Sequence, residues 1–116
     1  SGKIINVSSI FGIISKKKRA SYSTSKAGLI GLTKAMALDL ASHNILVNSV
    51  SPGFVSTELT KRILNKNEKN ELRKNVPISR FAESSEIVYL VLYLCSKYNT
   101  YLTGQNIVID GGYTIQ

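Results

Sequence analysis

Three short apolar runs have the pattern of buried β-strands. Lys3–Ser9 and Ile45–Val50 are rich in β-branched residues and almost continuously apolar, and Asn106–Asp110 repeats the pattern near the end of the chain. Such continuity is typical of parallel strands that are covered on both faces. Ser51-Pro52-Gly53 and Gly111-Gly112 follow the last two runs, and residues of these types end strands.

The segments between these runs have helical patterns. Large apolar side chains recur at helical spacing from Ser21 to Ser42, interleaved with Ala and Gly. Small residues weaken an isolated helix, so we expect another helix or a sheet to approach this one closely. Ser84–Lys97 is strongly apolar and opens on Ser and Glu, which suit a helix start. We expect the Lys- and Asn-rich stretch Ser56–Asn75 to be helical in pieces and mobile.

The order of these elements predicts an α/β fold. Strand, helix, strand, helix, helix, strand is the grammar of βαβ units, whose right-handed crossovers give a parallel sheet with helices on its faces. Three such strands make a poor stand-alone domain, because a buried-type strand would be left with an open edge. We therefore expect the first strand to have a neighbour supplied by sequence upstream of Ser1.

Composition indicates a globular protein of 116 residues, with 43% hydrophobic and 19% charged residues. The single Cys95 lies in an apolar run, so it is interpreted as a small buried hydrophobe. One cysteine forms no internal disulfide, and a reducing cytoplasm is the expected location. The longest mostly apolar stretch, Ile87–Cys95, is too short to span a bilayer, so no membrane association is expected.

The net charge of +8 is concentrated in Lys16–Arg19 and Lys61–Lys74. Such an excess could direct the chain toward nucleic acid, an acidic protein or a phosphorylated ligand. A solvated loop and helix surface is the simpler interpretation. A nucleic-acid-binding module is the weaker alternative, because aromatic interleaving, metal-ligand spacing and a recognisable nucleic-acid motif are all absent. No metal site is expected.

Tyr22 and Lys26 are candidates for acid–base chemistry. Residues four apart share one face of a helix, and a nearby lysine charge favours the phenolate form of a tyrosine, which general acid–base catalysis requires. Tyr93 and Lys97 have the same spacing. In that apolar helix, Tyr93 is interpreted as a core residue and Lys97 as a cation near the helix end.

The sequence context distinguishes the two pairs. Tyr22 follows the strand that ends at Ser9, whereas no strand precedes Tyr93 in this way. Ligands of parallel α/β sheets bind at the carboxyl ends of the strands. Ser9, Tyr22 and the Pro52-Gly53 turn are therefore expected to converge at one edge, and Ser8 is interpreted as a strand-end hydroxyl that satisfies local backbone.

The chain resembles the short-chain dehydrogenase/reductase family, most nearly the 3-oxoacyl-(acyl-carrier-protein) reductases and related alcohol and sugar dehydrogenases. The likeness covers essentially every residue, in the family's order and spacing. It rests on the segments Ile4–Ser9, Tyr22–Gly28, Val47–Gly53, Thr103–Gln105 and Asp110–Gly112.

This resemblance implies a doubly wound, Rossmann-like sheet, of which residues 1–116 would form the carboxyl-terminal, catalytic half without the nucleotide-binding half. It implies an NAD- or NADP-dependent enzyme that interconverts a carbonyl and a secondary alcohol by hydride transfer. The substrate would be a small molecule, either free or carried on acyl-carrier protein. The assembly would be a homodimer or homotetramer.

The resemblance also implies residue roles. Tyr22 would protonate the carbonyl oxygen, Lys26 would support the phenolate and bind the nicotinamide ribose, and Ser9 would hold the substrate oxygen. Four further residues would lie at the nicotinamide end of the cofactor, with Val55 contacting the carboxamide: Pro52, Gly53, Val55 and Thr57.

The sequence also departs from the family pattern in two places. Residues 1–116 contain no Gly-rich strand-to-helix turn of the kind that cradles a pyrophosphate, so the chain alone is expected to be inactive. Lys16–Arg19 stands where many relatives have a small, Gly-containing segment. It would bind an acidic carrier protein or a phosphorylated substrate, or it would be a surface loop without a binding role. The remaining alternative is a non-catalytic fragment that acts only through self-association.

Overall fold

Three parallel strands form the sheet at the centre of the computed structural model, which describes residues 1–116. β1 (Gly2–Val7) and β5 (Asn106–Ile109) flank β2 (Ile45–Pro52), giving the order β1-β2-β5. All three strands run in the same direction, as the alternation of strand and helix predicts. The predicted α/β fold with three parallel strands is therefore confirmed, with β1 at one edge of the sheet.

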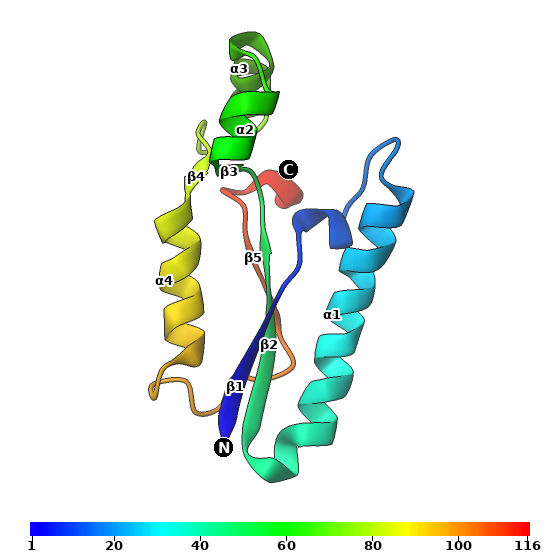
Figure 1. Ribbon diagram of the computed structural model, residues 1–116, viewed down its shortest axis with the longest axis vertical. Coiled ribbons are helices and arrows are strands. Elements are labelled where there is room, and N and C mark those ends of the chain that lie inside the picture. Colours follow the sequence, from blue (N-terminus) through cyan, green and yellow to red (C-terminus); the bar gives the residue numbers. More distant parts are fainter.

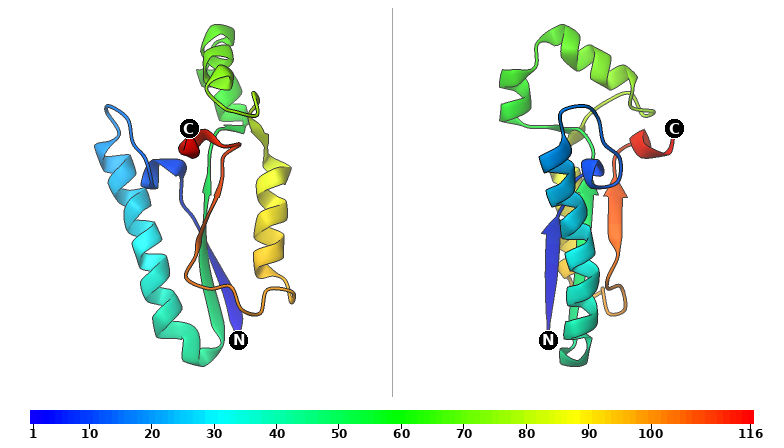
Figure 2. Two further views of the ribbon diagram at one scale, coloured as in Figure 1. Left: turned by 180° about the vertical axis from the view of Figure 1, so that it is seen from behind. Right: turned by 90° about the vertical axis from the view of Figure 1, so that its right-hand side faces the viewer.

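Two long helices cover opposite faces of this sheet (Figures 1 and 2). α1 (Ala20–Leu40) packs on one face and α4 (Ser84–Cys95) on the other. The smaller elements lie beyond the carboxyl ends of the strands, and the short parallel pair among them was not predicted: β3 (Val55–Ser56), α2 (Glu58–Ile63), α3 (Lys66–Lys74) and β4 (Ala82–Glu83). No helix is both long and apolar enough to cross a membrane.

The central strand β2 carries a buried polar ladder. Val47–Ser51 is fully buried, although three of its five side chains are polar. The Ser49 and Ser51 hydroxyls each donate to the Asn106 side-chain oxygen at a distance of 2.7 Å. The Asn48 side-chain amide makes hydrogen bonds with the backbone of the loop before β5. Every buried side-chain nitrogen and oxygen has a partner, which avoids the cost of burying unpaired polar groups. This ladder fixes β5 against β2.

The carboxyl end of α4 is capped from the sheet. The Lys3 ammonium, on β1, donates to the backbone oxygens of Ser96 (2.7 Å) and Asn99. A cation is favourable there because it meets the free carbonyls and the negative end of the helix dipole. Lys97 lies two residues beyond the end of α4, near the helix end as expected, and its ammonium lies 5.4 Å from the centre of the Tyr98 ring.

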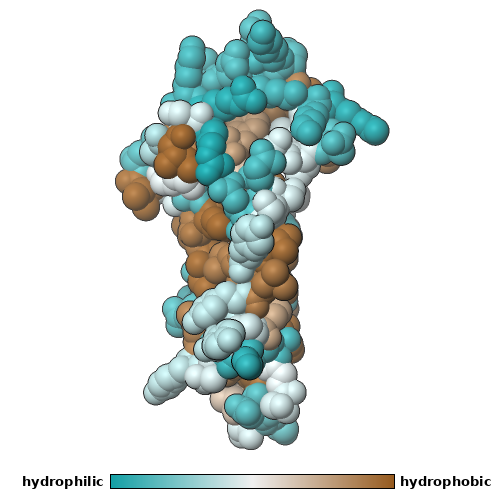
Figure 3. All heavy atoms as spheres, turned by 90° about the vertical axis from the view of Figure 1, so that its left-hand side faces the viewer, coloured by the Kyte–Doolittle hydropathy of each residue, from teal (hydrophilic) through white to brown (hydrophobic).

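The face of α4 that points away from the sheet is exposed and apolar (Figure 3). Four large side chains make up this α4 outer face: Val88, Tyr89, Leu92 and Tyr93. Leu94 is fully buried on the inner side, whereas Tyr93 is 49% exposed and Cys95 is exposed. The expectation that Tyr93 and Cys95 are buried was wrong, because nothing within this chain covers that side of the helix.

The molecule is elongated and has a small core. Its radius of gyration is 15.4 Å, against about 13 Å for a compact domain of this length, and 14 of its 116 residues are buried. Close approach along α1 occurs at Ala37, which is buried beside Gly104, and at Lys26 and Ala27, whose backbone meets Gly12. At Gly28 and Gly31 no atom lies within 4 Å of the place a Cβ would take. Most of the small-residue surface of α1 is therefore uncovered.

A bidentate ion pair holds the start of α4. The two terminal guanidinium nitrogens of Arg80 each donate to a Glu86 carboxylate oxygen at 2.8 Å, and Glu86 also accepts from the Glu83 N–H at 2.8 Å. These hydrogen bonds, the one from Arg80 first, lower the pKa of Glu86 from 4.5 to about 2. Because the folded pKa is lowered, the stability that this carboxylate contributes is present above pH 4.5 and lost as the pH falls toward 2.

We expect Arg80→Gln to raise the pKa of Glu86 toward its ordinary value, so that this contribution is lost at a higher pH. Carboxyl-carbon NMR titration of Glu86 measures the shift. Lys61→Gln is the matched control, because it breaks only the exposed contact with Glu58 at 3.6 Å. A Glu86 titration that is unchanged in Arg80→Gln would show that another group holds the carboxylate.

Candidate active site

The sequence-predicted site residues lie at the carboxyl edge of the sheet, at the top of Figure 1. Ser9 follows the end of β1, Tyr22 and Lys26 lie in the first two turns of α1, and Pro52 is the last residue of β2. Parallel strands all end on one side of a sheet, and the helices that follow them begin there. The topology thus brings segments distant in sequence to one edge.

Ser9 begins a 3-10 turn, Ile10–Gly12, directly after β1. Its backbone is extended, and its hydroxyl oxygen accepts from the Phe11 N–H at 3.1 Å. The side chain is buried, with only 7% of the residue exposed. Since the Ser9 oxygen acts here as an acceptor, its O–H remains able to donate to another oxygen.

The loop after β1 is locked onto the second turn of α1. Ser8 donates its hydroxyl to the Lys26 carbonyl at 2.9 Å, and the Lys26 ammonium donates to the Val7 carbonyl at 3.2 Å. A Cβ at Gly12 would stand 2.9 Å from the Lys26 carbonyl carbon, so only glycine fits. We refer to these contacts among Val7, Ser8, Gly12 and Lys26 as the β1–α1 clamp. The Ser8 hydroxyl does satisfy backbone, but on α1 rather than locally.

Tyr22 stands beside this clamp, and 44% of the residue is exposed. The Phe11 ring meets it edge to face, with the centres 6.4 Å apart, and the Lys26 ammonium lies 5.6 Å from the Tyr22 ring centre. No hydrogen bond within the chain engages the Tyr22 hydroxyl. The phenol is therefore free to meet a ligand, with a positive charge on the same side of the helix.

The second Tyr-x-x-x-Lys sequence has no such setting. Tyr93 lies in the last turn of α4, far from the carboxyl edge of the sheet, and α4 ends at Cys95. Lys97 follows the end of the helix, so the two side chains do not share a helix face. The structure thus separates two sequence-identical spacings.

An aromatic cluster supports the site and was missed in the sequence. Phe54 lies at its centre, with ring centres 6.5 Å from Phe11, 6.0 Å from Phe81 and 5.1 Å from Tyr113. Phe11 in turn contacts Tyr22. All three Phe residues of the chain belong to this cluster. The available signal was that each of them falls outside the apolar runs, among loop residues.

Gly53 brings the end of β2 against the segment after β5. A Cβ there would stand 2.8 Å from the Asp110 Cβ, so the pair packs tightly just after Pro52. Partial burial raises the pKa of Asp110, but hydrogen bonds from Thr114 and Gly112 outweigh it, and the net pKa is lowered. The Asp110 carboxylate thus orders the terminal turn rather than pointing free into the site.

Val55 and Thr57 form the turn that leads into α2. The Thr57 hydroxyl oxygen accepts from the Thr60 N–H at 3.1 Å and so caps the helix. The Thr60 hydroxyl donates to the Val55 carbonyl at 3.2 Å. These contacts hold the turn at the same edge of the sheet as Tyr22.

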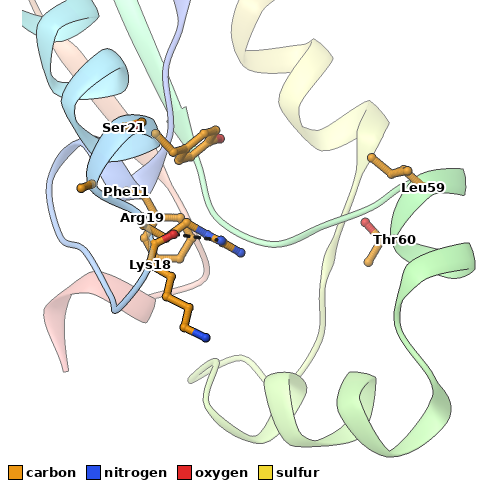
Figure 4. A pocket seen from close by; sticks show the side chains of 8 residues that line it. Phe11, Lys18, Arg19, Ser21, Leu59 and Thr60 are labelled. Carbon is orange, nitrogen blue, oxygen red and sulfur yellow. Dashed lines mark hydrogen bonds between the residues drawn. The ribbon is translucent and has the colours of Figure 1, made fainter.

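A cleft with a volume of about 880 Å³ separates the start of α1 from α2 (Figure 4). Tyr22 lines this cleft, whereas Ser9 and Lys26 do not. The complete lining is Phe11, Lys18, Arg19, Ala20, Ser21, Tyr22, Leu59 and Thr60. Leu59 and Thr60, on α2, were not predicted as site residues.

Comparison with known proteins identifies the family. A family model described as "Enoyl-(Acyl carrier protein) reductase" matches residues 1–114. A short-chain type dehydrogenase/reductase from Mycobacterium marinum superposes with a TM-score of 0.89 at 43% identity, over 100% of this chain and 46% of that one. The chain belongs to the short-chain dehydrogenase/reductase family.

Other members of the short-chain dehydrogenase/reductase family match equally well. The 3-oxoacyl-[acyl-carrier-protein] reductase of Aquifex aeolicus is 42% identical over 96% of this chain and 44% of the relative. That of Thermotoga maritima is 43% identical over 98% and 46%. A mutant 4-hydroxyisoleucine dehydrogenase complexed with NADH and succinate has a TM-score of 0.94 at 41% identity, over 100% of this chain and 48% of that one. The chain spans about half the length of these relatives.

The β1–α1 clamp generates a prediction. Gly12→Ala forces a methyl group against the α1 backbone, so it should lower the free energy of unfolding of the full-length protein by about 1–3 kcal/mol, measured by urea denaturation. Gly2→Ala is the matched control, because the nearest atom lies 3.9 Å from its Cβ position. Equal stability of the two variants would show that the loop and α1 can separate at no cost.

Proposed function

We propose that this chain is the catalytic part of an NAD- or NADP-dependent oxidoreductase that interconverts a carbonyl and a secondary alcohol by hydride transfer. The observation that carries the proposal is the setting of Tyr22. Tyr22 lines the cleft, its hydroxyl makes no hydrogen bond within the chain, and the Lys26 ammonium lies 5.6 Å from its ring centre. The family membership supports the same reaction class.

The proposed mechanism uses three side chains. Tyr22 donates its phenol proton to the substrate oxygen during reduction and takes it back during oxidation. The Lys26 charge favours the phenolate that this exchange creates. Ser9, held at the end of β1, donates a hydrogen bond to the oxygen as negative charge develops on it.

The residues present suit the nicotinamide end of a dinucleotide. The Lys26 ammonium spends one of its three donors on Val7, which leaves two for ribose hydroxyls. The bound cofactor supplies the hydride. Four residues at the same edge complete this proposed subsite: Pro52, Gly53, Val55 and Thr57. No Gly-rich turn for a pyrophosphate occurs in residues 1–116, so we assign that contact to polypeptide outside them.

A 3-oxoacyl group is the first candidate substrate, because the Aquifex and Thermotoga relatives are 3-oxoacyl-[acyl-carrier-protein] reductases. The cleft suits an acyl chain beside the reacting carbonyl, since Phe11 and Leu59 give its lining an apolar part. Reduction of such a group is the reaction to assay first.

We expect Tyr22→Phe in the full-length enzyme to lower kcat by about 10²-fold or more, because the phenol oxygen alone supplies the proton. The ring and its contact with Phe11 are retained, so the fold should survive. Steady-state oxidation of NADH or NADPH with a 3-oxoacyl substrate measures the change. Tyr93→Phe is the matched control and should keep the rate; near-normal activity of Tyr22→Phe would contradict the assignment.

The uncovered helix faces support a proposal of assembly. Leu32 and Leu38 on α1 are 51% and 80% exposed, and the α4 outer face is apolar. We propose that these faces are buried between copies in a homodimer or homotetramer, as closed symmetry favours. A non-catalytic fragment that only self-associates would bury the same faces but show no turnover.

Light scattering of the full-length protein at micromolar concentration should therefore show a dimer or tetramer. Leu92→Glu on the α4 outer face should reduce the mass, because a buried charge is costly. Tyr101→Glu is the control, since Tyr101 is 88% exposed and lies in a loop outside both faces. A monomeric wild-type protein would contradict the assembly.

A further inference from the structure

Lys18 and Arg19 are the only charged residues that line the cleft. Figure 4 shows both on the wall formed by the loop before α1, with Leu59 and Thr60 of α2 across the opening. Tyr22 lines the same cleft. Two cations therefore share one cavity with the proposed proton donor.

Neither cation has an acidic partner. The ion pairs of the structure are Lys61 with Glu58 and Arg80 with Glu86. Arg19 makes a single long hydrogen bond, from its guanidinium to the Lys18 carbonyl at 3.4 Å. An unpaired cluster of like charges at a cleft attracts anions, and a guanidinium presents a fork that matches carboxylate or phosphate oxygens.

The backbone holds Lys18 in an unfavourable conformation. Its φ is 64°, in the left-handed region that residues with a Cβ seldom adopt. Glycine would take this turn without cost, yet the position carries a lysine whose side chain lines the cleft. Strained residues of this kind cluster at ligand-binding sites.

We propose that the substrate of this enzyme carries an anionic group, a carboxylate or phosphate, which binds Lys18 and Arg19 while its carbonyl lies at Tyr22. The inference rests on the proposed function and adds a substrate class to it. Phe11 and Leu59 give the same cleft an apolar part. Within the proposed reaction, this favours a small free oxo acid or oxo phosphate, with an apolar body between its two polar ends, over a 3-oxoacyl group bound to a carrier protein.

The test compares charged and neutral ketones on the full-length enzyme. The substrates are the oxo acids from 3-oxobutanoate to 6-oxoheptanoate, each beside its own methyl ester, with saturating NADH or NADPH. The quantity measured is kcat/KM for the acid divided by kcat/KM for its ester. Wild type should favour at least one acid, and Lys18→Gln or Arg19→Gln should lower that ratio by about 10-fold, as loss of a charge-assisted contact predicts.

Lys17→Gln is the matched control, because Lys17 belongs to the same loop and loses the same charge but does not line the cleft. Its ratio should stay within about twofold of wild type, since a screened surface charge contributes little. Lys18→Gly separates binding from folding: it should keep the melting temperature, because glycine accepts a φ of 64°, and still lose the preference for the acid.

Binding of the oxo acids, followed by saturation-transfer NMR, separates this inference from the proposed function. If no ketone is turned over but the acid binds wild type and not Lys18→Gln, the anion site stands and the proposed reaction fails. Equal rates for acid and ester in wild type would overturn the anion site. Two other results would also overturn it. One is that Lys18→Gln and Arg19→Gln raise only the KM for NADH or NADPH; the other is that these variants lower activity only toward an acyl group carried on an acidic carrier protein.

Discussion

The contact on which the candidate site depends is the β1–α1 clamp. The Ser8 hydroxyl donates to the Lys26 carbonyl in the second turn of α1, and the Lys26 ammonium donates to the Val7 carbonyl at the end of β1. The absence of a side chain at Gly12 lets the two backbones touch. Because Ser9 follows Ser8 and Tyr22 lies one turn before Lys26, the clamp sets where both hydroxyls stand. Lys26 thus has a structural and a proposed chemical role, and its spare donors make the two compatible.

The opposite wall of the site rests on a different physical device. The buried polar ladder of β2 fixes β5, and the aromatic cluster around Phe54 then joins η1 (Ile10–Gly12), the segment before β4 and the terminal turn. Within the sheet, hydrogen bonds between buried polar side chains hold the strands together. Beyond the carboxyl ends of the strands, the chain consists mainly of loops, and contacts between aromatic rings hold those segments together in place of strand pairing.

Charged and apolar side chains are concentrated on different parts of the surface of this molecule. Lys18 and Arg19 line the cleft, where their lack of acidic partners leaves them open to an anion. Large exposed apolar side chains lie along α4, as Figure 3 shows, and at Leu32 and Leu38 of α1. The small buried core, the elongated shape and the relatives' greater length all fit a chain whose long helices pack against further protein.

The sequence by itself determined the three parallel strands, the two long helices and the edge at which Ser9, Tyr22 and Pro52 lie. Hydrophobic periodicity and the order of the elements carry that information, because the spacing of apolar residues within a short stretch of sequence indicates whether it forms a helix or a strand. Only the tertiary structure decided that Tyr93 and Cys95 are exposed, that Lys3 caps the carboxyl end of α4, and that Lys18 and Arg19 share a cleft with Tyr22. Each of these facts depends on which surfaces meet across long sequence separations, and local patterns do not encode such meetings.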